Sequence, residues 1–169
     1  MRQLFFFILP LLPVTTIAQE CDSLLSSKSF EGSKKVYTMM RTPIVLHGAI
    51  GESDWKIVML KLQGNGVAFL VNVSDPGFGC IDGDGTVAFT FENGVKLASP
   101  NESEDNCTGA GALKITPFSG HKKLRVLLAE QRITALRVKS KNGVFERTVT
   151  PGTADTIRRI YNCFTRKPE

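Results

Sequence analysis

Three Asn-Gly-Val triplets constrain the fold most strongly, because each predicts a tight reversal of the chain between two strands. The triplets begin at Asn65, Asn93 and Asn142. A type I′ hairpin turn requires positive φ at both central residues, and Asn-Gly adopts that conformation at low cost. The sequence therefore predicts three antiparallel hairpins.

The segments beside these triplets alternate as strands do. In residues 86–91, Val87, Phe89 and Phe91 point one way and the threonines point the other. Residues 55–62 are apolar on both faces, which is typical of a central strand. The predicted strands are 43–47, 55–62, 67–73, 86–91 with its continuation at 95–97, 111–116, 133–139 and 144–150.

Two segments change to helical spacing. After Ser119, a predicted cap, Leu124, Leu127 and Leu128 fall at i, i+3 and i+4. After Thr153, a second predicted cap, one apolar stripe combines Ile157, Ile160, Tyr161 and Phe164. Asp155 lies in the first turn of that second helix, where the helix dipole favours a negative charge.

This order of elements predicts one α+β domain at residues 19–169. We expect a largely antiparallel sheet of six to nine strands, with a short helix and a C-terminal helix packed on it. A β-sandwich with peripheral helices is the alternative. Residues 99–111 are the most loop-like stretch.

Residues 1–18 have the layout of a secretory signal peptide. Arg2 precedes the apolar run from Leu4 to Val14, and small residues lead to a cleavage point after Ala18. A lipid anchor on Cys21 is the competing hypothesis, although Glu20 stands where a lipoprotein signal wants a small residue. No later apolar run is long enough for a membrane helix. We expect a periplasmic or secreted protein, for which nucleic acid is an unfavourable partner.

The four cysteines all follow the predicted leader. An even number in an exported chain predicts two disulfides, with three possible connectivities. We choose Cys80–Cys107, which closes a loop-rich segment, and Cys21–Cys163, which ties the N-terminus to the C-terminal helix. Buried free thiols are the alternative, while a zinc site would require closely spaced pairs that the chain lacks.

Acidic residues gather at both ends of the segment between Cys80 and Cys107. Calcium takes six to eight oxygen ligands, so a weak calcium site is a hypothesis for this region. The segment is not an EF-hand loop, because position 12 counted from Asp82 is Asn93 rather than a glutamate. A solvated acidic turn explains the same residues without a metal. The candidate ligands are Asp82, Asp84, Glu102, Glu104 and Asp105.

Basic residues gather between positions 122 and 141. With a formal net charge of +5 for the chain, they suggest contact with an acidic glycan, an envelope component or an acidic protein. Solvated outer faces of a helix and a strand are the alternative explanation. The candidate ligand-binding residues are Lys122, Lys123, Arg125, Arg132, Arg137 and Lys139.

The C-terminal third resembles small exported proteins of Bacteroidota. The similarity rests on Leu-Leu-Ala-Glu-Gln-Arg-Ile-Thr-Ala-Leu-Arg-Val at 127–138, on Asn142-Gly143, and on Ile-Tyr-Asn-Cys at 160–163. In those proteins a short helix leads into a strand and a hairpin, and a final helix ends near a cysteine. The resemblance implies an exported protein with a sheet-plus-helix fold, and it transfers no catalytic residue.

Motifs for catalysis are weak. His47 and His121 lack metal-ligand spacing, and no G-x-S-x-G elbow is present. The sequence therefore favours an exported, non-catalytic binding module that uses no cofactor. The alternative is a hydrolase of envelope or dietary glycan that uses carboxylates of the 80–107 region. A toxin-like or inhibitor-like protein, which would contact its target through the disulfide-bound loop, is a third hypothesis.

Overall fold

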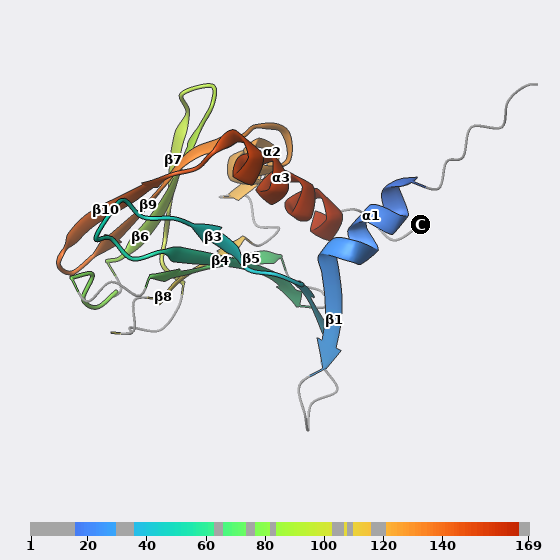
Figure 1. Cartoon of the computed structure of the whole chain (residues 1–169), viewed down its shortest axis with the longest axis horizontal. Coiled ribbons are helices and arrows are strands. Elements are labelled where there is room, and N and C mark those ends of the chain that lie inside the picture. The colour runs from blue at the N-terminus through green and yellow to red at the C-terminus, as the bar shows by residue number, and fades with distance from the viewer. Residues whose placement is uncertain are drawn as a thin grey trace, which may run out of the picture.

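The computed structural model describes residues 16–29, 36–62, 66–73, 77–81, 84–102, 107, 110–115 and 121–165. Within these ranges the chain forms three helices and two antiparallel sheets (Figure 1). The elements are α1 (Thr16–Leu24), β1 (Leu25–Ser29), β2 (Val36–Met40), β3 (Ile44–Leu46), β4 (Trp55–Leu62), β5 (Val67–Val73), β6 (Thr86–Phe91), β7 (Lys96–Pro100), β8 (Ala110–Ile115), α2 (Lys122–Glu130), β9 (Ile133–Ser140), β10 (Gly143–Thr148) and α3 (Pro151–Thr165).

The strands divide between two sheets. The 6-stranded sheet has the order β1-β2-β4-β5-β8, with β3 also paired to β4, and the 4-stranded sheet has the order β10-β9-β6-β7. The predicted α+β class, the antiparallel pairing and the packing of the C-terminal helix on strands are confirmed. The separation into two sheets follows the alternative that the sequence left open.

The three predicted hairpins form, as β4–β5, β6–β7 and β9–β10. The expected type I′ turn geometry is wrong for the second and third, because no described residue other than glycine has positive φ. At the β6–β7 turn, Gly94 N donates to Phe91 O at 2.9 Å and Gly94 has φ +80°. This is a type I turn followed by a left-handed glycine, so only the glycine needs the unusual conformation.

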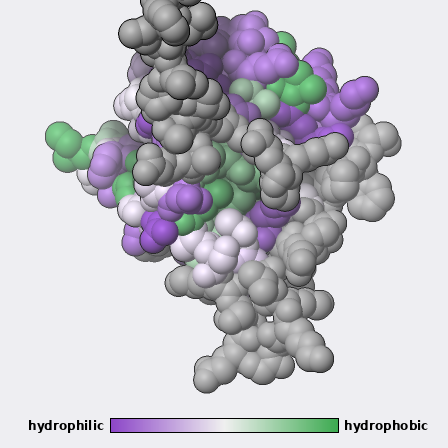
Figure 2. Space-filling model, turned by 90° about the vertical axis from the view of Figure 1, so that its right-hand side faces the viewer, coloured by the Kyte–Doolittle hydropathy of each residue, from purple (hydrophilic) through white to green (hydrophobic). Residues whose placement is uncertain are grey.

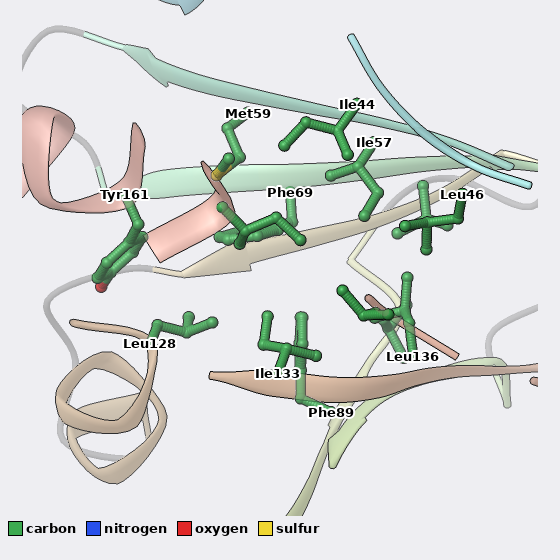
Figure 3. Close-up of a cluster of buried hydrophobic side chains, with 14 of the residues drawn as sticks. Ile44, Leu46, Ile57, Met59, Phe69, Phe89, Leu128, Ile133, Leu136 and Tyr161 are labelled. Carbon is green, nitrogen blue, oxygen red and sulfur yellow. The ribbon is translucent and has the colours of Figure 1, made fainter. Parts of the chain in front are cut away.

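The core lies between the two sheets. Phe69 of β5 contacts Phe89 of β6 edge to face, with ring centroids 5.6 Å apart. Side chains of α2 and α3 close one end of this space, where Tyr161 and Leu128 lie beside the strand residues (Figure 3). The predicted apolar stripe of α3 is buried as expected, at Ile157, Ile160, Tyr161 and Phe164.

Helix α3 begins three residues earlier than predicted. Thr150 Oγ1 accepts a hydrogen bond from Thr153 N at 3.3 Å, so Thr150 rather than Thr153 is the cap. Pro151 occupies the first helical position, where its fixed φ suits the helix and its missing N–H costs nothing. At the other end of α3, Lys61 Nζ donates to Phe164 O at 2.8 Å.

The opposite end of the sheet pair is closed by residues 77–81. Phe78 and Ile81 are fully buried there, and Phe78 contacts both Trp55 and Phe145. The β9–β10 turn holds this segment: Ser140 Oγ donates to Phe78 O, and Lys141 N donates to Cys80 O at 2.9 Å. The sequence did not predict this arrangement, because an irregular segment has no periodic pattern.

Several further elements were not predicted. Helix α1 crosses the expected cleavage point after Ala18, and β1 and β2 form the outer edge of the larger sheet. For α2, the predicted cap Ser119 lies outside the described residues, and His121 occupies the cap position. Seen from the end that carries α1, the surface mixes hydrophilic and hydrophobic areas (Figure 2).

Candidate functional site

The predicted disulfides are confirmed. Cys21 pairs with Cys163 and Cys80 pairs with Cys107, so none of the four cysteines is free. Each bond lies at a different end of the sheet pair. Cys21–Cys163 joins α1 to α3, and Cys80–Cys107 anchors the segment that covers the opposite end.

The six predicted basic residues do not form one patch. Lys122, Lys123 and Arg125 belong to α2, and Arg137 and Lys139 belong to β9. Arg132, which precedes β9, donates from Nε to Asp155 Oδ1 and from Nη2 to Asp155 Oδ2, both at 2.9 Å. Arg132 is thus engaged within the protein.

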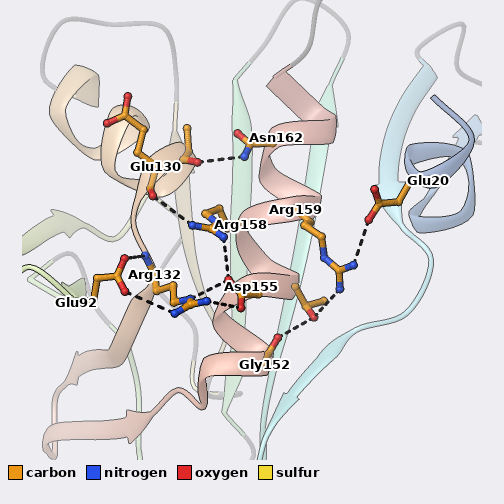
Figure 4. A network of polar contacts seen from close by, with 11 residues as sticks. Glu20, Glu92, Glu130, Arg132, Gly152, Asp155, Arg158, Arg159 and Asn162 are labelled. Atoms are coloured by element: carbon orange, nitrogen blue, oxygen red, sulfur yellow. Dashed lines mark hydrogen bonds and ion pairs between the residues drawn. The ribbon is translucent and has the colours of Figure 1, made fainter. Parts of the chain in front are cut away.

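Arg132 and Asp155 are the centre of a polar network at the end of the sheet pair that α2 and α3 cover, which we call the helical end (Figure 4). Hydrogen bonds from Arg132 lower the pKa of Asp155, and the Asp155 carboxylate raises the pKa of Arg132. Arg158 donates to the same carboxylate at 2.9 Å and to Glu130 O at 3.4 Å. Arg159 pairs with Glu20 of α1 at 3.1 Å. The network fastens α3 to its neighbours and leaves little free charge for a ligand.

The solvent side of the 4-stranded sheet carries exposed basic residues on β7 and β9. Exposed side chains alternate with buried ones along β9 and β10, and β6 contributes half-buried small residues. We call this surface the outward sheet face. It consists of Thr86, Ala88, Thr90, Lys96, Ala98, Pro100, Arg137, Lys139, Val144 and Glu146.

The register places a basic row beside a strip of short side chains. Lys139 is opposite Thr86 on one side and Val144 on the other. Arg137 is opposite Ala88 and Glu146, and its Nε donates to Glu146 Oε2 at 2.6 Å. Among the described residues, Lys139 and Lys96 have no ion-pair partner. The outward sheet face therefore offers unpaired positive charge on exposed side chains.

Helix α2 places its basic residues differently. Lys122 and Lys123 are exposed at its start, and Val126 is exposed one turn later. Burial raises the pKa of Tyr161 to about 12, and the half-buried Arg125 opposes this with a smaller effect. Only the two lysines of this helix remain available to an external partner.

The acidic candidates are only partly placed by the structure. Asp82, Glu104 and Asp105 lie outside the described residues. Asp84 and Glu102 flank neighbouring strand ends, where Asn101 N donates to Gly85 O at 2.9 Å. Glu102 Oε1 lies 3.5 Å from His121 Nε2. The part of the chain that the structure describes holds no group of three or more potential metal ligands, so the calcium hypothesis depends on the other three carboxylates.

A buried arginine is the functional candidate that the sequence analysis missed. Arg147 of β10 is only 8% exposed, and its guanidinium lies over the Trp55 ring, 5.0 Å from the centroid. Its Nη1 contacts Glu52 Oε2 at 2.9 Å, and its Nη2 donates to Ser53 O at 3.3 Å. We call Glu52, Trp55 and Arg147 the Arg147 cluster.

One sequence signal could have revealed the Arg147 cluster. Phe145 and Arg147 occupy alternate positions of β10, and Val149 continues the alternation just past its end, so the three share the inward face. A charged residue between two apolar ones on a buried face requires a compensating charge. The partner, Glu52, lies 95 positions earlier in a turn, and pattern analysis does not reveal such a distant pair.

The turn between β3 and β4 carries Glu52 to the arginine. Glu52 N donates to Ala49 O at 2.9 Å, and Gly51 has φ +87°. Ile50, at the tip of this turn, is fully exposed. Asp54 steadies the base of the turn by accepting from Gly48 N at 3.2 Å. Polar contacts, rather than buried apolar side chains, hold the turn in place.

Comparison with protein-family models, curated proteins and solved structures finds no match to this chain.

Proposed function

We propose that this chain is an extracytoplasmic binding protein without catalysis of its own, and that it holds an acidic glycan of the cell envelope or of its surroundings on the outward sheet face. The observation that carries this proposal is the unpaired positive charge of Lys139 and Lys96 on an exposed sheet surface. The short side chains between them leave space for an extended polymer to approach the backbone of β6.

The disulfides support the proposed location. Two disulfides and no free thiol are typical of proteins in an oxidising compartment. Among the described residues no helix is long and apolar enough to span a membrane. The leader at residues 1–18 remains a prediction that agrees with this location.

Binding of polygalacturonate, with neutral dextran as the control polymer, tests the proposal. Reversing both charges in Lys96→Glu/Lys139→Glu should weaken binding about tenfold or more, since each reversal removes roughly 1 kcal/mol of attraction. Binding by the unaltered protein should weaken strongly as salt rises, because exposed charges are screened.

The matched control is Lys122→Glu/Lys123→Glu, which changes the net charge equally on α2. This control should change polygalacturonate affinity less than threefold. Equal losses in both variants would show that net charge, rather than the outward sheet face, drives binding. New reducing ends in the incubated polymer would instead support the glycan-hydrolase alternative.

A further inference from the structure

We infer that Arg147 is a receptor for the carboxylate of a uronic-acid unit, and that Glu52 occupies this position in the free protein. The inference rests on the proposed binding of acidic glycans and adds the specific contact for their carboxylate group. It concerns the opposite side of β10 from the outward sheet face, at the exposed edge of the 4-stranded sheet.

Arg147 has unused hydrogen-bonding capacity. A guanidinium carries five N–H donors, and Arg147 uses Nη1 toward Glu52 and Glu146 O and Nη2 toward Ser53 O. Its Nε is buried without an acceptor among the described residues, and so is Nε1 of the adjacent Trp55. A buried donor without an acceptor is costly, so an additional acceptor at this position would stabilise the site.

Glu52 satisfies the arginine incompletely. A single oxygen, Oε2, contacts Arg147 Nη1 and also accepts from Ala49 N at 3.1 Å. An incoming carboxylate can bind a guanidinium with both oxygens, which gives a stronger and more directional pair than one shared oxygen. Binding of the ligand carboxylate is therefore more favourable when Glu52 has moved away from Arg147.

The turn is able to move at low cost. The Glu52 side chain is 47% exposed while that of Arg147 is 9% exposed, so Glu52 separates the arginine from solvent. Ile50 at the tip is fully exposed, and among the described residues the hydrogen bonds and ion pairs from the turn to β10 all run to Arg147. Moving residues 49–53 would break polar contacts but would open no apolar cavity.

Removing the internal carboxylate gives the sharpest test. Glu52→Gln should bind galacturonate about tenfold more tightly than the unaltered protein, because the ligand no longer competes with a bound glutamate. A gain in affinity cannot arise from misfolding. Trp55 is the single tryptophan, so its fluorescence reports the change directly.

Three comparisons control this test. Glu92→Gln removes another arginine-paired glutamate, at the β6–β7 turn, and should leave galacturonate affinity unchanged. Galactose, which lacks the carboxylate, should produce no fluorescence response. Arg147→Lys placed in the Glu52→Gln background should abolish the gain, because lysine lacks the planar pair of donors.

A second variant should move Glu52 away from Arg147 by steric contact. A Cβ on Gly48 would lie 2.8 Å from atoms of Glu52, so Gly48→Ala should displace that residue and also tighten galacturonate binding. Unchanged or weaker binding in Glu52→Gln would overturn the inference. If galacturonate does not bind while polygalacturonate still binds through Lys96 and Lys139, only the inference about Arg147 is wrong. If polygalacturonate does not bind and galacturonate does, only the proposal for the outward sheet face is wrong.

Discussion

At one end of the two sheets, α2 and α3 cover the core with residues that recur at helical spacing; at the other, the irregular segment 77–81 covers it with Phe78 and Ile81. Both ends have similarly buried aromatic side chains and one disulfide each. They differ in the sequence separation of the two cysteines that each disulfide joins. The helical end is tied by a bond of sequence separation 142, and the irregular end by a bond of separation 27.

This difference shows that regular secondary structure is not required to close a core. The irregular end instead uses backbone acceptors bound by a neighbouring turn, as at Phe78 O and Cys80 O. A segment of this kind is stable only when the turn that satisfies it is already in place. The helical end can form its internal hydrogen bonds before it docks.

Removal of each disulfide should produce the largest and most unequal effects. In the chain-entropy model the bond that closes the longer loop contributes about 5 kcal/mol and the other about 3.5 kcal/mol. Urea unfolding of Cys21→Ala/Cys163→Ala and of Cys80→Ala/Cys107→Ala measures both. A greater loss from the second pair would show that local contacts around Cys80 outweigh loop length.

Truncating one buried aromatic residue at each end compares their packing. Phe78→Ala and Phe164→Ala should each lower the free energy of unfolding by about 3–5 kcal/mol, since both side chains are almost fully buried. Guanidinium unfolding provides the measurement. A loss below about 1 kcal/mol for Phe78→Ala alone would exclude the irregular end from the cooperative core.

Two buried serines, one with a hydrogen-bond acceptor and one without among the described residues, test how much a buried hydrogen bond contributes to stability. Ser140→Ala should cost about 1–3 kcal/mol, because it leaves the carbonyl oxygen of Phe78 without its donor. Ser99 is equally buried, yet its Oγ has no partner among the described residues, so Ser99→Ala should be neutral or stabilising. Equal losses in thermal unfolding would indicate that packing rather than hydrogen bonding matters at both positions.

The smallest expected effect is a change in acid sensitivity at the helical end. The folded state holds the pKa of Asp155 below that of an unfolded aspartate. Its contribution is thus fully present above about pH 4 and is lost as pH falls through the depressed value. In Asp155→Asn, the fall in unfolding free energy between about pH 4 and pH 2 should be shallower; an unchanged slope would assign acid sensitivity to other carboxylates.

The sequence predicts the helical end well and the irregular end poorly. Ile157, Ile160 and Phe164 repeat at a spacing that only one structure satisfies, so their burial follows from the pattern. Phe78 lies in a stretch rich in glycine and proline, where no periodicity indicates whether an aromatic side chain is inside. Whether the Phe78 side chain is buried depends on how segments far apart in the sequence pack together.

The candidate site shows the same limit. Alternation along β9 predicts that Arg137 and Lys139 share one side, and the structure places both among the exposed residues. The neutralisation of Arg132 by Asp155 depends on how α3 docks, which residue order does not reveal. Likewise, Glu52 meets Arg147 only because the turn before β4 reaches the edge of the other sheet.

Cys21–Cys163 connects the first described element to the last, and this has a consequence for maturation. In a chain exported N-terminus first, Cys21 enters the oxidising compartment long before its partner, which follows 142 positions later. Cys80 and Cys107 arrive in between, and either one is able to capture the waiting thiol. Thiol–disulfide exchange must then undo any such early crosslink. If the chain is exported in this way, the Cys21–Cys163 bond is therefore the last of the two disulfides to form.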